Sequence, residues 1–158
     1  MHIRPTTKAD LAAVDALLAR TYPKLLKADY PPSVLVTALP VISRAQPQLL
    51  VCGTYYVVEE DGAVLGAGGW TPDCKDSSLG HIRHVVTDDR ALRRGVGRRL
   101  MTHCFDVARA DGVSKMECWA TRTAVPFYEA VGFRRVGLID VQLGEGITFP
   151  SVRMMLDL

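Results

Sequence analysis

One stretch of the sequence constrains the fold more than any other: a strand pattern followed by an Arg- and Gly-rich turn and a long helical pattern. Residues 81–87, His-Ile-Arg-His-Val-Val-Thr, have the length and β-branched content of a strand. Beyond the turn, apolar residues recur at three- and four-residue steps, as on one face of a helix: Val96, Leu100, Cys104, Val107 and Ala108. The chain therefore predicts a strand–turn–helix unit with glycines at the start of the helix.

The turn itself predicts a binding site for an anion. Gly95 and Gly97 fall in the first helical turn, where backbone N–H groups have no partner in the helix and the helix dipole is positive. Glycines let a phosphate touch the backbone there. Five arginines add positive charge: Arg90, Arg93, Arg94, Arg98 and Arg99. They could instead form a solvated surface, but five arginines at one glycine-bearing turn favour phosphate binding.

A second motif lies some thirty residues further on, in the segment 124–133. Its apolar residues Val125, Tyr128 and Val131 share one face of a short helix. Gly132 is placed to end that helix, and Phe133 begins the next strand.

Together the two motifs resemble the GCN5-related N-acetyltransferase (GNAT) family. Residues 93–100, Arg-Arg-Gly-Val-Gly-Arg-Arg-Leu, are similar to its acetyl-CoA pyrophosphate loop, written Gln/Arg-x-x-Gly-x-Gly/Ala, although Leu92 stands where the family has the initial Gln or Arg. Residues 128–133 match its Tyr-Glu-x-x-Gly-Phe segment. The resemblance implies an α/β (α+β) fold, with a mixed, mostly antiparallel sheet and helices on both faces, and it covers the single domain 1–158.

The rest of the chain gives an order of elements that agrees with this fold. Thr7 can cap a first helix that we expect to end near Pro23, and residues 33–39 form a second helix. Asp61-Gly62 joins two strands, 54–60 and 63–70. Glycines at 66, 68 and 69 indicate either a bulge or the close approach of another backbone or a ligand. Further strands are expected at 115–120, 133–143 and 151–156.

The resemblance also implies acetyl-CoA as cosubstrate and assigns roles to particular residues. Tyr128 takes the position of the tyrosine that protonates the departing CoA thiolate, and His81 takes the position of a glutamate that some members use as a base. The strand that ends at Thr87 lines the pantetheine arm. The cofactor-binding residues are then Val86, Thr87, Arg93, Arg94, Gly95, Val96, Gly97 and Arg98.

Each catalytic assignment has an alternative. Tyr128 could be a core tyrosine. His84 is expected on the opposite strand face from His81 and is interpreted as structural, while Asp73 and Asp76 offer other bases. The two histidines therefore form no metal site, and none is expected elsewhere.

The predicted reaction is transfer of an acetyl group to a primary amine by direct attack in a ternary complex. A small-molecule amine is the first choice of acceptor and a peptide or protein amine the second. Tyr22, Tyr30, Tyr55 and Trp70 could form an aromatic wall for it, or belong to the core. A non-catalytic acyl-CoA-binding module is the alternative from another class.

The composition argues against other kinds of protein. A net charge of +2 is too small for a general nucleic-acid surface, and no apolar run approaches the roughly 20 residues that span a membrane. The N-terminus lacks the apolar segment of a signal peptide, so a cytoplasmic location is expected. A homodimer is possible, with the last strand as the pairing edge.

Overall fold

A seven-stranded sheet runs through the molecule, in the order β1-β2-β3-β4-β5-β7-β6. The computed structural model describes residues 1–158. Neighbouring strands are antiparallel except β4 and β5, which are parallel. The strands are β1 (His2–Pro5), β2 (Tyr55–Glu60), β3 (Ala63–Pro72), β4 (Leu79–Thr87), β5 (Lys115–Ala120), β6 (Arg134–Gly144) and β7 (Ile147–Asp157).

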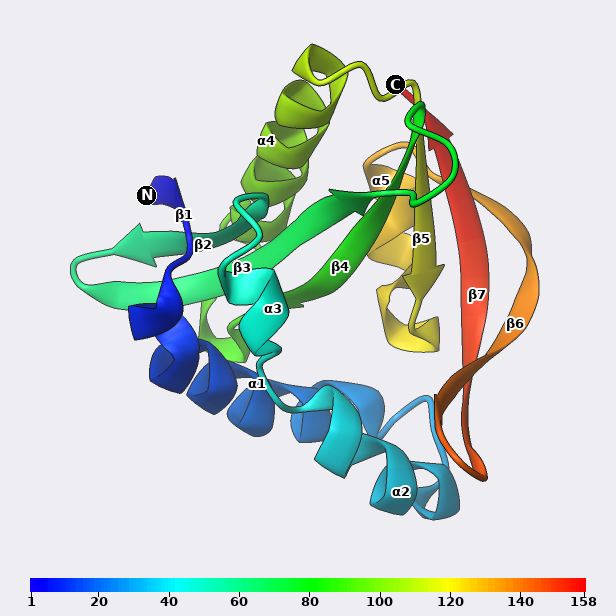
Figure 1. Ribbon diagram of the computed structural model, residues 1–158. Coiled ribbons are helices and arrows are strands. Elements are labelled where there is room, and N and C mark those ends of the chain that lie inside the picture. The colour runs from blue at the N-terminus through cyan, green and yellow to red at the C-terminus, as the bar shows by residue number, and fades with distance from the viewer.

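Helices cover both faces of this sheet (Figure 1). On one face lie α1 and α3, with α2 beside α1 and close to the far end of the β6–β7 hairpin; α4 and α5 lie on the other. None of these helices is both long and apolar enough to cross a membrane. Their bounds are α1 (Leu11–Leu26), α2 (Pro32–Ile42), α3 (Pro47–Leu50), α4 (Val96–Ala110) and α5 (Val125–Ala130).

Local sequence accounts for several of these boundaries. Asp61 and Gly62 both have positive φ, at 52° and 79°, as a tight two-residue hairpin requires, so the predicted β2–β3 hairpin is confirmed. The Thr7 side chain accepts a hydrogen bond from Ala9 N, and the Asp10 carboxylate accepts one from Thr7 N. This capping box starts the turn that leads into α1.

The alternation of side chains along β2 divides the core between the two faces of the sheet. Tyr56 and Val58 pack in a cluster of 21 buried residues under α4 and α5. Tyr55 and Val57 point the other way, into a cluster of nine under α1 and α3. A third cluster ties α1 and α2 to the hairpin and consists of Leu26, Tyr30, Leu35, Ala38 and Phe149.

Two expectations were wrong. The first helix does not stop near Pro23 but continues to Leu26. A proline within a helix costs about 3 kcal/mol, and the burial of Leu26, which is 2% exposed, in the third cluster favours the longer helix. The last strand, β7, is not an edge, because it lies between β5 and β6. The free edges belong to β1 and β6.

Candidate active site

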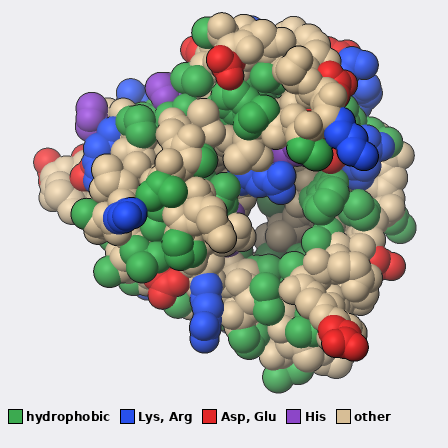
Figure 2. All heavy atoms as spheres, in the orientation of Figure 1, with side chains coloured by type: hydrophobic (Ala, Val, Ile, Leu, Met, Phe, Trp, Pro, Cys, Tyr) green, Lys and Arg blue, Asp and Glu red, His purple; other side chains and the backbone are tan.

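The parallel strands β4 and β5 diverge and open a cavity between them. They are paired only from Leu79 to His81, opposite Lys115 to Glu117. Beyond His81, β4 has no partner strand on that side. A cavity of about 450 Å³ occupies the space, lined by the ends of both strands and by α1, α5 and the β6–β7 hairpin. Figure 2 shows the hollow near the centre of the molecule, where the two strands separate in Figure 1.

A bulge changes the direction of β4 inside this cavity. Gly69 pairs with Arg83 and Ala67 with Val86, so His84 and Val85 together lie opposite the single residue Gly68. His84 has a φ of 50°, which is rare for a residue with a side chain. A Cβ on Gly68 would lie 2.8 Å from Val85 Cγ2. Both interpretations of the β3 glycines therefore apply. The pairing of β3 with β4 contains a bulge, and β4 approaches β3 closely at Gly68.

Two buried tyrosines hold the bulge from the helical side. The Tyr55 hydroxyl donates to His84 O at 2.7 Å, and the Tyr22 hydroxyl donates to Val85 O at 3.0 Å. Both carbonyls are thereby satisfied although they lie outside the regular ladder. Of the four residues suggested as an aromatic wall, only Tyr22 lines the cavity. Tyr30, Tyr55 and Trp70 are buried in the core clusters.

The start of α4 leaves its first N–H groups free, as the glycine pattern predicted. Gly95 adopts a φ of 77° at the N-cap and makes no side-chain capping bond. The first helical hydrogen bond runs from Arg99 N to Gly95 O, so the N–H groups of Val96, Gly97 and Arg98 have no backbone partner. Gly97 sits against Phe127 and Thr87, which line the cavity. The turn thus adjoins the open edge of β4.

The arginines of the turn are not all available for an anion. Arg94 pairs with Glu60 at 2.5 Å, and Arg98 donates to Ala130 O at 3.3 Å. Arg90 pairs with Asp88 at 3.1 Å. The side chains of Arg93 and Arg99 make no hydrogen bond or ion pair with the protein. These two arginines and the free backbone N–H groups are therefore what the turn can offer to an anion.

Asp88 fixes the connection between β4 and α4. Its side chain is 4% exposed and accepts from Arg90 and, at 2.6 Å, from Arg20 of α1. These bonds lower the pKa of the Asp88 carboxyl to about 2, and the bond from the Arg90 side chain has the largest effect. Sequence reasoning missed this residue, although an aspartate directly before a helical turn is a common N-cap.

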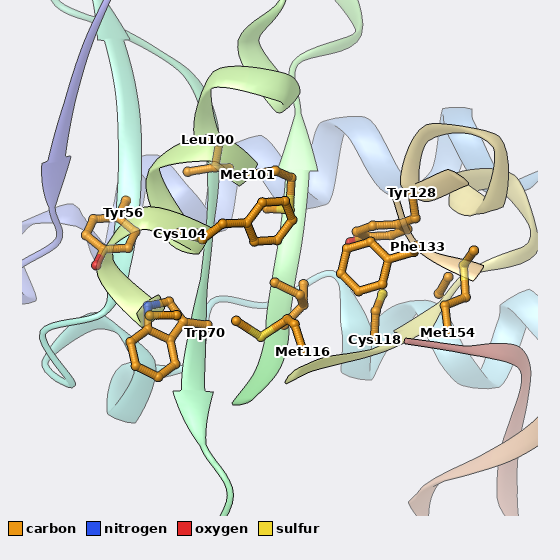
Figure 3. Close-up of a cluster of buried hydrophobic side chains, with 14 of the residues drawn as sticks. Tyr56, Trp70, Leu100, Met101, Cys104, Met116, Cys118, Tyr128, Phe133 and Met154 are labelled. Carbon is orange, nitrogen blue, oxygen red and sulfur yellow. The ribbon is translucent and has the colours of Figure 1, made fainter. Parts of the chain in front are cut away.

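Tyr128 on α5 faces the cavity from the side of β5. Its ring packs edge-on to Phe133 at 5.4 Å, and Cys118 lies in the same buried cluster (Figure 3). Burial raises the pKa of Tyr128 well above its ordinary value and that of Cys118 to about 12. Both groups are therefore protonated at neutral pH and can donate a hydrogen bond.

The two histidines of β4 have different surroundings. His81 does not line the cavity: its Nε2 lies 2.8 Å from Asp73 Oδ1 and its Nδ1 lies 3.1 Å from Glu117 Oε1, where β4 and β5 are still paired. His84 does line the cavity, and its Nε2 lies 2.7 Å from Ile42 O. The bulge interrupts the alternation of side chains between the two faces of β4, so the faces on which His81 and His84 lie cannot be related by counting residues. The structure therefore brings His84, rather than His81, together with Tyr128 and Thr87.

The lining of the cavity is mostly apolar. Eighteen of the 25 lining residues are hydrophobic, and they include Leu25, Ile42, Leu49, Val141 and Phe149. Neither a carboxylate nor a lysine lines the cavity; Arg83 is its one arginine.

Comparisons with known proteins agree with the fold. A family model described as the acetyltransferase (GNAT) domain matches residues 41–158. The mouse protein named "Probable N-acetyltransferase family 8 member 5" is 30% identical over 116 residues, which are 69% of this chain and 50% of that protein. The glucosamine 6-phosphate N-acetyltransferase of Trypanosoma brucei brucei is 33% identical over 57 residues, 36% of this chain and 39% of that protein. The chain thus spans half the length or less of these curated relatives.

Solved structures share the whole architecture. The GCN5-related N-acetyltransferase from Rhodopseudomonas palustris superposes with a TM-score of 0.84 at 18% identity, covering 99% of this chain and 95% of that one. The PaiA N-acetyltransferase from Thermoplasma acidophilum, solved with coenzyme A, gives a TM-score of 0.77 at 12% identity, with coverage of 99% and 98%. The predicted mixed α/β fold is confirmed, and the chain belongs to the GNAT acetyltransferase domain family.

Proposed function

We propose that this chain is an acetyl-CoA-dependent N-acetyltransferase that acetylates the primary amine of a small, largely apolar molecule. The observation that carries the proposal is a cavity that joins the unpaired edge of β4 to the Tyr128 side chain, with the free N–H groups of α4 beside it, where Gly97 lies against the lining residues Thr87 and Phe127. The names of the relatives, which are N-acetyltransferases, support the same reaction.

The α4 turn fits a pyrophosphate. The free N–H groups of Val96, Gly97 and Arg98 meet the positive end of a helix dipole. Gly95 and Gly97 keep side chains away from this surface, and Arg93 has no other partner. Val86 and Thr87 would line the pantetheine arm along the open edge of β4. We assign the cofactor to this surface, with the backbone as its main donor.

Tyr128 is proposed as the proton donor. When bound, acetyl-CoA supplies a thioester whose carbonyl carbon the amine nitrogen attacks. As the C–N bond forms and the C–S bond breaks, the sulfur needs a proton, which the Tyr128 hydroxyl can donate because burial keeps it protonated. The adjacent Cys118 thiol, also protonated, does not compete for that proton as a base.

The lining indicates the class of acceptor. A cavity of about 450 Å³ without a carboxylate has no group to pair with an ammonium ion. Polyamines and aminoglycosides carry several such charges and would be disfavoured. An amine with one basic nitrogen and an apolar body fits the lining described above.

Thiol release from acetyl-CoA tests the proposal. Purified protein would be assayed with phenethylamine, tryptamine, spermidine, an aminoglycoside and an apolar peptide with a free α-amine, beside a control without amine. We expect release with the apolar monoamines and little with spermidine. Binding of acetyl-CoA without release by any amine would instead support a non-catalytic acyl-CoA module, and preference for the peptide would move the acceptor class to peptide amines.

A further inference from the structure

His84 presents a single ring nitrogen to the cavity. Its Nε2 lies 2.7 Å from Ile42 O, and because a carbonyl oxygen only accepts, Nε2 must carry a proton. In the neutral ring Nδ1 is then the acceptor. Nδ1 makes no hydrogen bond with the protein, and it is not among the buried polar atoms that lack a partner, so it remains accessible.

The ring is held in place from three elements. Ile42 ends α2, Tyr22 of α1 packs edge-on to the imidazole at 6.0 Å, and Tyr55 of β2 bonds the His84 carbonyl. The left-handed backbone at His84 is part of the bulge, which aims the side chain into the cavity instead of along the regular strand face.

No other group that lines the cavity can accept a proton at neutral pH. The Tyr22 hydroxyl donates to Val85 O, and burial raises its pKa. Burial likewise raises the pKa of Cys118 to about 12 and that of Tyr128 well above its ordinary value. Arg83 is a cation, and the lining contains no carboxylate.

We propose that His84 Nδ1 takes the proton that the acceptor amine loses during acetyl transfer. This inference rests on the proposed function. The amine lone pair forms the C–N bond, the C–S bond breaks with its electron pair on sulfur, the nitrogen releases one proton to His84 Nδ1, and Tyr128 gives one proton to the sulfur. Exchange with solvent then returns a proton to Tyr128 and removes one from His84. The role that the family resemblance gave to His81 thus passes to His84.

The surroundings of His84 keep the imidazole neutral. The imidazole faces the Tyr22 ring and the Ile42 carbonyl. The Tyr55 hydroxyl bonds the His84 carbonyl, Cys118 and Tyr128 line the same cavity, and Arg83 precedes His84 in the chain. Burial lowers the pKa of His84, and no carboxylate opposes this shift. Because the neutral form is the base, activity should fall only as the pH drops through a value below the ordinary pKa of about 6.5.

The first test is His84→Gln. The Gln amide nitrogen can still donate to Ile42 O but offers nothing in place of Nδ1. We expect kcat to fall about a hundredfold, with acetyl-CoA affinity and thermal stability near those of the wild type and without the acid limb of the pH profile. A kcat within about threefold of the wild type would show that His84 is only structural.

A second variant separates chemistry from folding. His84→Gly suits the left-handed backbone and leaves space for a free imidazole. Added imidazole should restore part of kcat in His84→Gly and none in His84→Gln, where the space is filled. Failure of rescue, with folded protein that binds acetyl-CoA, would contradict the role of His84 as a base.

Nitrogen NMR of the imidazoles, with His84 assigned from the Gln variant, gives a readout besides activity. We expect the Nε2–H tautomer and a neutral ring at pH 7; a proton on Nδ1 at that pH would overturn the inference. If the wild type releases no thiol with any amine, the proposed function fails and this role with it. An active wild type beside an active His84→Gln overturns the role of His84 alone.

Discussion

The two ends of β4 differ in how their polar groups are satisfied. At the start of the strand, β4 is paired with β5, and His81 lies between the Asp73 and Glu117 carboxylates. Glu117 also accepts from Arg153 at 2.6 Å. At the other end β4 has no partner on that side, its bulge carbonyls are bonded by tyrosines, and a nitrogen of His84 faces the cavity.

This difference shows how one strand can serve both structure and binding. At the paired end, backbone pairing and side-chain contacts hold β4 against β5. The open end keeps backbone and side-chain groups free for ligands, and three anchors stabilise it from outside the ladder: Tyr22, Tyr55 and the Asp88 network. We therefore expect changes to the ligand-facing groups of the open end to affect binding and turnover, changes to its anchors to affect stability, and changes at the closed end to affect stability alone.

The largest effect is expected from Gly97→Glu at the open end. A Cβ at Gly97 would lie 2.8 Å from the Phe127 ring, and the new carboxylate would stand beside the surface proposed to bind the pyrophosphate. We expect acetyl-CoA affinity, measured by calorimetry, to fall at least a hundredfold, or about 3 kcal/mol. Gly137→Glu is the matched control, because Gly137 has open space around it. Equal affinity in the two variants would remove the α4 turn as the pyrophosphate site.

Tyr128→Phe should have the next largest effect. The ring and its packing on Phe133 remain, but the proposed proton donor is lost. We expect kcat to fall about ten- to a hundredfold while acetyl-CoA affinity stays the same. Turnover equal to that of the wild type would exclude Tyr128 as the acid and leave it as a core residue.

Asp88→Asn tests the anchor of the open end. It removes the charge that Arg20 and Arg90 share, at a cost of about 1–3 kcal/mol in the free energy of unfolding. Because the folded-state pKa of Asp88 is lowered to about 2, its stabilisation is present above the ordinary carboxyl pKa and is lost as the pH falls toward 2. Urea unfolding at pH 7 and pH 2 should therefore show a difference between the two proteins that is much smaller at the lower pH.

The smallest effect on turnover is expected from His81→Gln at the closed end. The contacts with Asp73 and Glu117 weaken, so stability decreases slightly, but no group of the cavity changes. We expect kcat within about threefold of the wild type, against the hundredfold loss for His84→Gln. The reverse order of the two losses would restore His81 as the base.

The glycine turn and the hairpins could be predicted because their signals are local. Gly95 and Gly97 at a helix start, and Asp61-Gly62 between two strands, specify backbone geometry within a few residues. The order of elements follows from such patterns, and the family motifs supply the fold. The same motifs predict that β4 lines the pantetheine arm.

The cavity chemistry could not be predicted because it depends on tertiary contacts. The bulge at His84 requires Gly68 on the neighbouring strand, and strict alternation along residues 81–87 gives no sign of it. The tautomer of His84 is set by a carbonyl 42 residues earlier in the chain. The continuation of α1 through Pro23 likewise depends on the burial of Leu26 against α2 and the hairpin.

The separate cluster of Leu26, Tyr30, Leu35, Ala38 and Phe149 has a consequence for motion. It is much smaller than the cluster under α4, so opening it exposes less apolar surface than opening the rest of the core. Amide hydrogens of α2 should therefore exchange with solvent at a lower free-energy cost than those of α4. The wall proposed to face the acceptor would then open and admit a bulkier amine while the half proposed to hold the cofactor stays folded.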